Sequence, residues 1–326
     1  MNKKINWGII GLGNIAEVFA NDLQLCEQAK LFGVASRDLK KAEKFAKRFN
    51  SKTCFGSYEQ LMQNPEIDVV YIATPHVFHF ENTMCCLQNN KSVLCEKPLG
   101  MNLRQVKKMF EKAEKEKLFL MEGLWSRFIP ATEKLLELLK SGEIGEIVSI
   151  RADFGFRPPF DLNSRIYNKA LGGGSLLDVG IYPIYLSLLL LGEPKAIEAM
   201  ARFASTGVDS YCCILFDYEK NEKAVLESSI ESDTPLTAYI YGTEGRIKLH
   251  NRFHHCQKIS LFKHDGKKKV YEIAYKGNGY LHEIQQVNKS LLEGQIQNKK
   301  HSRQMSEALM RTLDRVRRKI GLSYDI

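Results

Sequence analysis

The sequence contains no uninterrupted apolar run long enough to cross a lipid bilayer. Its longest strongly apolar stretch, residues 181–191, is short and is interrupted by Pro183 and Ser187. The first residues combine basic side chains with an apolar run, as a secretory signal does, but this run is rich in glycine and leads into a helical pattern without a cleavage site. We therefore expect no membrane-spanning segment, and we interpret the first apolar run as a β-strand.

The cysteines lack the spacing of a metal site or of a disulfide framework, because no C-x-x-C motif occurs and two pairs are adjacent. His254 and His255 stand beside Cys256, but no second cluster of ligands follows at a suitable spacing, which favours a hairpin or surface role over metal binding. We expect no metal, reduced and mostly buried thiols, and a cytoplasmic location. The eight cysteines are Cys26, Cys54, Cys85, Cys86, Cys95, Cys212, Cys213 and Cys256.

Internal repeats and clustered charge are also missing. No segment recurs at a period of roughly 20 to 50 residues, which makes a solenoid or a propeller an unsuitable interpretation. The formal net charge is +9, but the lysines and arginines are spread along the chain, mostly in mixed-charge helical segments such as KKMFEKAEKEK. Such segments are typical of solvated helix faces, so we expect no nucleic-acid partner, and only a modest attraction for anionic ligands stays open.

Residues 1–124 alternate short apolar runs with amphipathic helical segments. Continuous hydrophobicity within the runs is typical of parallel strands that are covered on both faces. Apolar residues recur at helical spacing in residues 38–49, and Ser57 and Gln60 stand at capping-box positions before a further helix. We expect an α/β Rossmann domain with a doubly wound parallel sheet. The expected strands lie in INWGIIG (5–11), KLFGVAS (30–36), DVVYIAT (68–74), SVLCEKP (92–98) and LFLMEGL (118–124).

Residues 125–326 have a different pattern, in which longer β-rich segments alternate with a few helices. This pattern predicts a C-terminal α+β domain with a large, open, mainly antiparallel sheet and helices on one face. Apolar side chains in YCCILFDY indicate that the other face is buried too, so we expect a homodimer or higher homo-oligomer through this sheet. Strands are expected in 146–156, 211–218, 224–232, 237–250 and 258–275, with hairpin turns at GTEG and HDGK and helices in 130–140, 176–191, 281–293 and 303–319.

GLGNIA, residues 11–16, follows the first expected strand and opens a helix. Gly11 permits a tight turn, Gly13 lets a pyrophosphate approach the backbone N–H groups at the helix N-terminus, and Ala16 allows the helix to pack closely on the strand. In this strand, turn and helix order the motif predicts a dinucleotide site. Its expected cofactor-binding residues are Gly11, Leu12, Gly13, Asn14 and Ile15.

The second expected strand ends with Ser36 and Arg37, where NAD-specific proteins usually place an acidic residue. A guanidinium can pair with a 2′-phosphate and stack on adenine, and a serine hydroxyl can donate to the same phosphate. We therefore expect NADP as the cofactor. NAD stays open, because Asp38 could bind the ribose, although its position also suits a helix N-cap.

Glu96 and Lys97 finish a strand, and Pro98 ends its pairing. Ligands of a doubly wound sheet bind beyond the carboxyl ends of its strands, so these two residues are expected to face the cofactor, with Lys97 projecting towards a substrate between the domains. The alternative is a surface ion pair at a strand end, which stabilises weakly.

Four motifs together resemble one family: GLGNIA, ATPHVFH at 73–79, EKP at 96–98 and GGGSLLDVGIYPI at 172–184. The chain is similar, over essentially its whole length, to the glucose-fructose oxidoreductase and inositol dehydrogenase (Gfo/Idh/MocA) family. LCEKPLG, FLMEGLWSRFIPA and LLDVGIY look closest to its NADP-linked, dimeric dihydrodiol dehydrogenase branch.

The resemblance implies that Lys97 is the active-site lysine and that Asp178 and Tyr182 face it. It further implies that the nicotinamide half of the cofactor lies along Thr74, Pro75, His76 and His79. Sugar and inositol dehydrogenases of the family usually have histidine in place of Tyr182, so the tyrosine weakens a sugar or inositol assignment.

In the expected mechanism Tyr182 is the acid and base, Lys97 is its electrostatic partner and an oxyanion stabiliser, and Asp178 orients them. A mechanism in which Lys97 carries the proton stays open. Asp178 and Tyr182 are four residues apart and would share a helix face, but Pro183 indicates an irregular entry to that helix. A helix cap at Asp178 and a core position for Tyr182 are the structural alternative.

Four further residues could line an aromatic substrate pocket, or could belong to the core: Trp125, Arg127, Phe154 and Tyr280. The expected function is that of an NADP-dependent oxidoreductase that transfers hydride between nicotinamide and a cyclic diol, a sugar-like polyol or a dicarbonyl. The alternatives are an NAD-dependent sugar or inositol dehydrogenase and a non-catalytic NADP-binding sensor. The substrate depends on loops such as residues 154–170, whose path the sequence does not predict.

Overall fold

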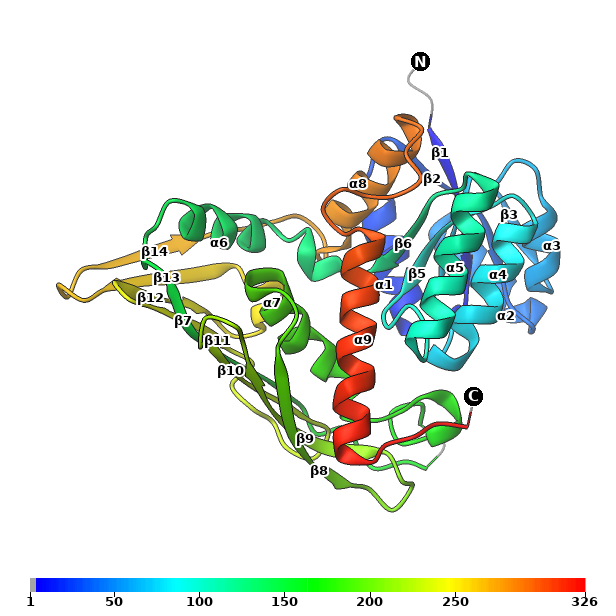
Figure 1. Cartoon of the computed structure of the whole chain (residues 1–326). Helices are drawn as coiled ribbons and strands as arrows, with labels where there is room; N and C mark the ends of the chain where they lie inside the picture. The colour runs from blue at the N-terminus through cyan, green and yellow to red at the C-terminus, as the bar shows by residue number, and fades with distance from the viewer. Residues whose placement is uncertain (1–3, 163, 326) are drawn as a thin grey trace. The chain divides into compact units, whose positions relative to one another are not determined.

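The structure, a computed structural model, describes residues 4–162 and 164–325. The chain divides into two compact units that are not continuous in sequence. Unit 1 contains Met1–Phe128 and Lys276–Glu307, and unit 2 contains Ile129–Tyr275 and Ala308–Ile326. The single boundary predicted after residue 124 places residues 276–307 in the second domain, whereas the structure places them in unit 1. Figure 1 shows the chain with most of its helices and strands labelled.

Unit 1 contains a six-stranded sheet in the order β3-β2-β1-β4-β5-β6. Every neighbouring pair is parallel, as predicted. The five predicted strands are present, whereas β3 was not predicted, because three half-buried residues leave too short a pattern. The strands are β1 (Ile5–Ile10), β2 (Ala29–Ala35), β3 (Thr53–Phe55), β4 (Val69–Ile72), β5 (Ser92–Glu96) and β6 (Leu120–Gly123).

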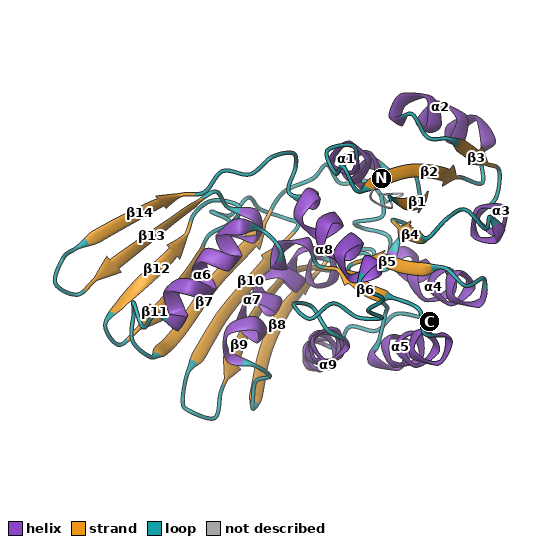
Figure 2. Ribbon diagram, turned by 90° about the horizontal axis from the view of Figure 1, so that it is seen from above, coloured by secondary structure: helices purple, strands orange, loops and turns teal. Residues whose placement is uncertain are grey.

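Helices cover both faces of this sheet. Figure 2 shows α1 on one face and α4 and α5 on the other. The cap predicted at Asp38 is present, because its carboxylate accepts from the N–H of Lys41. Ser57 likewise caps α3, but Gln60 accepts from the N–H of Gly56, so only half of the capping box forms. The helices are α1 (Asn14–Leu23), α2 (Leu39–Phe49), α3 (Tyr58–Gln63), α4 (His79–Gln88), α5 (Leu103–Glu116) and α8 (Tyr280–Leu292), with 3-10 turns η1 (His76–Phe78) and η2 (Trp125–Arg127).

Asp22 holds the late segment Lys276–Glu307 in unit 1. It is completely buried at the end of α1. Its carboxylate accepts from the backbone N–H groups of Asn278, Tyr280 and Leu281 at 2.8–3.2 Å. Asp22 is thus the acceptor for the N-terminal N–H groups of α8, which otherwise have no helical partner. The contact joins residues more than 250 positions apart.

Unit 2 contains an eight-stranded sheet in the order β14-β13-β12-β11-β7-β10-β9-β8. Only β7 and β10 pair in parallel, so the sheet is mainly antiparallel, as predicted. The edge strand β8 was not predicted, because its residues are mostly exposed. The strands are β7 (Ile147–Gly155), β8 (Ala196–Phe203), β9 (Asp209–Asp217), β10 (Lys223–Ser229), β11 (Ala238–Gly242), β12 (Gly245–Leu249), β13 (Lys258–Lys263) and β14 (Lys268–Glu272).

Buried and exposed side chains alternate along the strands, which gives this sheet one apolar face. In β9, Cys212, Ile214 and Phe216 are buried, whereas Leu215 is 45% exposed. The apolar face is covered by α6 and α7, which Figure 2 shows lying across the strands. The helical segments of unit 2 are α6 (Pro130–Lys140), η3 (Lys169–Leu171), the π-helical turn η4 (Leu176–Gly180), α7 (Ile181–Leu191) and η5 (Phe253–His255); α9 (Arg303–Ile320) begins within the residues of unit 1 and ends within those of unit 2.

One helical stretch, Lys169–Leu191, is long and apolar enough to cross a membrane by length and composition alone. Of its most apolar window, 83% is buried inside the fold, which is the environment of a core helix. The eight cysteines are free, and five of them are buried, in agreement with the prediction of reduced thiols.

Replacing Asp22 with asparagine should lower the free energy of unfolding by about 2–4 kcal/mol, because buried N–H groups lose a charged acceptor and face an amide instead. Urea unfolding monitored by tryptophan fluorescence measures this loss. Glu17→Gln on the same helix is the control, since its ion pair with Arg48 is 39% and 59% exposed and should contribute about 1 kcal/mol or less. Equal losses in the two variants would show that Asp22 does not fasten α8.

Candidate active site

The glycine turn lies where the strand order of unit 1 reverses, between β1 and β4. Gly11 has φ +80°, and a Cβ added to it would lie 2.5 Å from the carbonyl carbon of Ala73, so only glycine fits between the two strand ends. A Cβ on Gly13 would meet no heavy atom within 4 Å. The space beside Gly13 therefore opens at the start of α1, at the crevice where doubly wound sheets bind ligands.

The residues of this turn suit a diphosphate. Gly13 is the N-cap of α1 and offers no side chain to its first N–H groups, which leaves them available to an anion. Asn14 is exposed and Ile15 is half-buried, whereas Leu12 is buried. Ala16 is completely buried, as the close packing of α1 on the sheet requires. The turn thus fits the dinucleotide that its sequence predicts.

At the end of β2, Ser36 is half-buried and Arg37 is exposed. The hydroxyl of Ser36 accepts from the N–H of Asp38, and the carboxylate of Asp38 is used in capping α2. Tyr58, which is not among the predicted site residues, lies close to both Arg37 and Gly11. Burial raises its pKa, while the Arg37 guanidinium and a backbone hydrogen bond from Gly11 act in the opposite direction. From the sequence, Tyr58 is predicted only to be part of the helix that Ser57 caps.

After β4, Thr74 and His76 are buried, Pro75 is half-buried and His79 is completely buried. The ring nitrogens of His79 lie 2.8 Å from the carbonyl oxygens of Thr74 and Pro98. Burial lowers the pKa of His79, and the two carbonyls oppose that shift with a smaller effect. These contacts tie the segment after β4 to the segment that follows Lys97.

Glu96 is the last residue of β5, and Lys97 follows it half-buried, joined to Pro98 by a cis peptide bond. The hydroxyl of Tyr71 donates to Glu96 at 2.5 Å, and burial raises the pKa of Tyr71 well above its usual range, which keeps it a donor. Beyond Pro98, the N–H of Leu99 donates to buried Glu122 at 2.9 Å. Lys97 therefore stands between two backbone segments that buried carboxylates hold.

Two of the proposed pocket residues meet within unit 1. The rings of Trp125 and Tyr280 stack with centroids 4.6 Å apart and planes at 10°. The guanidinium of Arg127 is buried and donates to the carbonyl of Lys300 at 3.2 Å. Arg127 therefore helps to position the chain just before α9.

In unit 2, Asp178 lies in η4, the irregular helix entry that Pro183 predicts. The guanidinium of Arg165 donates to both carboxylate oxygens of Asp178, at 3.0 and 3.4 Å. Asp178 is buried, whereas the Arg165 side chain is 51% exposed. Arg165 was not a predicted site residue, because it lies in the loop whose path the sequence does not predict. A two-pronged contact of this kind fixes the plane of the carboxylate.

Tyr182 is buried in the first turn of α7 and belongs to a group of three rings. Its centroid lies 5.6 Å from that of Phe154 and 4.8 Å from that of His254. Phe154 and His254 stack at 4.5 Å. The hairpin interpretation of His254 is confirmed, because η5 lies in the connection between the antiparallel strands β12 and β13. The surface interpretation was wrong, because His254 is buried. Its neighbour His255 is half-buried, and burial lowers its pKa to about 4.

The predicted site residues therefore form two groups. The glycine turn, the segment after β4, Lys97 and the Trp125–Tyr280 pair belong to unit 1, whereas Asp178, Tyr182 and Phe154 belong to unit 2. Arg165 and His254 join the second group. Among residues 4–162 and 164–325, no three histidine, cysteine, aspartate or glutamate side chains form a group that could hold a metal ion.

Family models match both halves of the chain. The model described as an oxidoreductase family with an NAD-binding Rossmann fold matches residues 5–124. The Gfo/Idh/MocA C-terminal domain model matches residues 132–248.

Curated relatives match nearly the whole chain. A trans-1,2-dihydrobenzene-1,2-diol dehydrogenase of Mus musculus is 35% identical over an alignment of 332 positions that covers 98% of each chain. The Homo sapiens protein of the same name is 33% identical over an alignment of 333 positions, again with 98% of each chain covered.

Solved structures have the same fold. A 3-ketoreductase from Actinomadura kijaniata in complex with NADP and TDP-benzene has a TM-score of 0.89 at 25% identity, with 98% of each chain covered. An aldose-aldose oxidoreductase from Caulobacter crescentus complexed with glycerol has a TM-score of 0.88 at 22% identity, with 97% of each chain covered. Since the models and the full-length relatives agree, this chain belongs to the Gfo/Idh/MocA family of oxidoreductases.

Proposed function

We propose that this protein is an NADP-dependent oxidoreductase that transfers hydride between the nicotinamide and a cyclic diol, a sugar-like polyol or a dicarbonyl. The observation that carries the proposal is the setting of Tyr182, a buried phenol beside the stacked rings of Phe154 and His254 and in the same helical segment as Asp178. Relatives that are named trans-1,2-dihydrobenzene-1,2-diol dehydrogenases, at 33% and 35% identity, support the substrate class.

The cofactor would be held by the glycine turn and the start of α1, with its adenosine end near Ser36 and Arg37. We base the preference for NADP over NAD on Arg37. The carboxylate of Asp38 caps α2, because its Oδ1 accepts from the N–H of Lys41. Arg37 is exposed beside it and offers a guanidinium to a 2′-phosphate.

The bound nicotinamide supplies or accepts the hydride, and the chain's own residues handle the proton and the position of the substrate. In the proposal the Tyr182 hydroxyl donates a proton to the developing alkoxide during reduction and takes it back during oxidation. Lys97 stabilises the negative charge as a fixed cation. Asp178, which Arg165 holds, orients the phenol and the substrate hydroxyl. Lys97 and Tyr182 belong to different units, and the proposal requires both to act on one substrate.

Phe154 and His254 would give the substrate an aromatic wall with one polar edge. The stacked Trp125 and Tyr280 form a separate aromatic surface within unit 1. Flat faces of this kind suit a ring that carries adjacent hydroxyls, because the ring packs on the faces while the hydroxyls bond to polar groups at the edge.

Replacing Arg37 with alanine should raise the KM for NADP about 10- to 100-fold and leave the KM for NAD nearly unchanged, because a charge-assisted hydrogen bond to a phosphate contributes roughly 1.5–3 kcal/mol. Initial rates at saturating diol with each cofactor measure this. Arg48→Ala on α2 is the control, since that guanidinium pairs with Glu17 on α1. Equal effects on both cofactors would contradict NADP selection by Arg37.

Tyr182→Phe should lower kcat by about 10²- to 10⁴-fold with cofactor affinity preserved, since general acid–base catalysis contributes that much. Lys97→Met should be similarly slow. Tyr218→Phe is the control, because its buried hydroxyl bonds Ser187 and its loss reports the general cost of removing a phenol. Turnover is followed at 340 nm, and NADPH binding is followed separately by its fluorescence.

Undiminished turnover in Tyr182→Phe would exclude the phenol as the proton donor, and an active Lys97→Met would remove both forms of the mechanism. If the wild-type chain binds NADPH but reduces NADP with no diol, polyol or sugar, a cofactor-binding sensor becomes the better account.

We also propose that the uncovered face of the eight-stranded sheet joins two copies of this chain. Met200, Leu215 and Val225 are 77%, 45% and 41% exposed. Leu215 pairs with Val225 on the next strand, and Met200 pairs with Cys213, so these side chains share one face. Apolar side chains gathered on an uncovered sheet favour burial against a second copy, with which the same residues would meet themselves.

Leu215→Glu should weaken dimerisation at least about a hundredfold, because a carboxylate would be buried without a partner. Size-exclusion chromatography with light scattering should then give the mass of one chain for the variant and of two chains for the wild type. Leu292→Glu, at a side chain 41% exposed at the end of α8, should leave the dimer intact. A wild-type mass of one chain would refute the proposal.

A further inference from the structure

Asp209, at the start of β9, is a completely buried acid that no step of the proposed chemistry uses. One of its carboxylate oxygens, Oδ2, accepts from the hydroxyl of Ser175 and from the backbone N–H of Leu176, each at 2.7 Å. Leu176 is the first residue of η4, the turn that carries Asp178 and continues into Tyr182. Asp209 is therefore bonded to the beginning of the segment that bears both proposed catalytic residues of unit 2.

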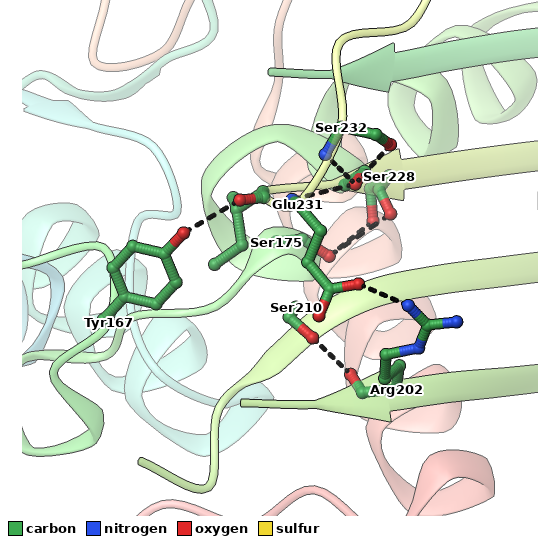
Figure 3. A network of polar contacts seen from close by, with 9 residues as sticks. Tyr167, Ser175, Arg202, Ser210, Ser228, Glu231 and Ser232 are labelled. Atoms are coloured by element: carbon green, nitrogen blue, oxygen red, sulfur yellow. Dashed lines mark hydrogen bonds and ion pairs between the residues drawn. The ribbon is translucent and has the colours of Figure 1, made fainter. Parts of the chain in front are cut away.

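The same segment is held from other elements. The hydroxyl of Tyr324 donates to the carbonyl of Gly173 at 2.6 Å. Figure 3 shows the hydroxyls of Ser175 and Ser228 facing each other, at 2.9 Å. Gly174 has φ +117°, and a Cβ there would collide with the second oxygen of Asp209, Oδ1. The backbone thus approaches the carboxylate so closely that only glycine fits at this position.

We propose that Asp209 is the positioning residue of the catalytic turn: by accepting from Ser175 and Leu176, its carboxylate sets where Asp178 and Tyr182 lie. This inference rests on the proposed function of those two residues. It adds a residue that touches neither substrate nor cofactor and that acts through the backbone of η4.

Burying the charged form of Asp209 costs free energy. Burial raises the pKa of Asp209 to about 7, and the hydrogen bonds from Ser175 and Leu176 only partly offset this. The titratable neighbours Cys212 on β9 and Tyr324 supply no positive charge to stabilise the carboxylate. Both are neutral, because burial raises their pKa values. Arg317 on α9 lies over the ring of Tyr324 and pairs with Asp314.

The sign of the pH effect follows from these pKa values. An aspartate that titrates near 3.8 in the unfolded chain and near 7 in the fold binds its proton more tightly when folded. Its contribution to stability is complete below pH 4 and is lost as the pH rises through 7. The charged form, however, gives the stronger hydrogen bonds to η4, because a charge-assisted bond is roughly twice as strong as a neutral one. Above pH 7 the fold is less stable but the turn is held better.

Asp209→Asn separates a positioning role from a merely structural one. The variant should unfold at a higher urea concentration than the wild type at pH 8.5, with the two closer at pH 5, because each pKa unit changes the folding equilibrium tenfold. Its kcat at pH 8.5 should nevertheless fall about 10- to 100-fold, since a small displacement of a catalytic group has that effect. Amide exchange in residues 174–180 should become faster. A structural residue would lose stability and activity together.

Ser210→Ala is the matched control. Ser210 is the neighbour of Asp209 and is equally buried, but Figure 3 shows its hydroxyl donating to the carbonyl of Arg202, away from η4. It should leave turnover and exchange in residues 174–180 unchanged. Ser175→Ala removes one donor to the same carboxylate. It should lower turnover and speed exchange in residues 174–180 less than Asp209→Asn does, but it should lower stability at pH 8.5, because the buried carboxylate loses a hydrogen bond. It serves if Asp209→Asn does not fold.

Wild-type turnover together with wild-type exchange in residues 174–180 for Asp209→Asn would overturn the inference. So would a loss of stability at pH 8.5 that matches the loss of activity. If the wild-type chain proves inactive with every diol and polyol, the proposed function fails instead. The exchange and urea measurements then still decide whether Asp209 holds η4, because neither depends on turnover.

Discussion

Buried carboxylates that accept backbone N–H groups fix the segments that bear the candidate site. Asp22 accepts from the backbone N–H at the start of α8, and Glu122 accepts from the N–H of Leu99, just after the Lys97–Pro98 bond. Asp209 accepts from the N–H at the start of η4. Burying an acid is costly unless its oxygens are bonded, and a backbone donor cannot move without moving its whole segment. Each of these hydrogen bonds therefore offsets part of the cost of burying the carboxylate and fixes the position of one backbone segment.

Much of the first unit could be predicted from the sequence, because a parallel sheet buried on both faces produces continuous apolar runs. The glycine turn was predictable for a related reason: only glycine fits where Gly11 meets the end of β4. The cap at Asp38 was predictable because a helical pattern of apolar residues begins directly after it. In contrast, β3 and β8 were not predicted, because three half-buried residues and an exposed edge strand carry little periodic signal.

The side chains around the candidate catalytic residues were harder to predict, since they come from loops and from distant parts of the chain. Arg165 reaches Asp178 from a loop without a regular pattern. His254 was judged by its neighbours His255 and Cys256, whereas its ring contacts Phe154 and Tyr182. Asp209 shows no signal of its own in the sequence. The irregular entry at Pro183, by comparison, was predictable from the chemistry of proline, and it is the turn that Asp209 holds.

Transfer of hydride is the central claim, and isotope transfer tests it most directly. Trans-1,2-dihydrobenzene-1,2-diol carrying deuterium on its carbinol carbons would be incubated with the protein and NADP, and the reduced cofactor would be analysed by mass spectrometry. The account predicts NADPH that contains one deuterium from the diol. Bound cofactor that acquires no deuterium from this diol, or from a deuterated polyol, would contradict it.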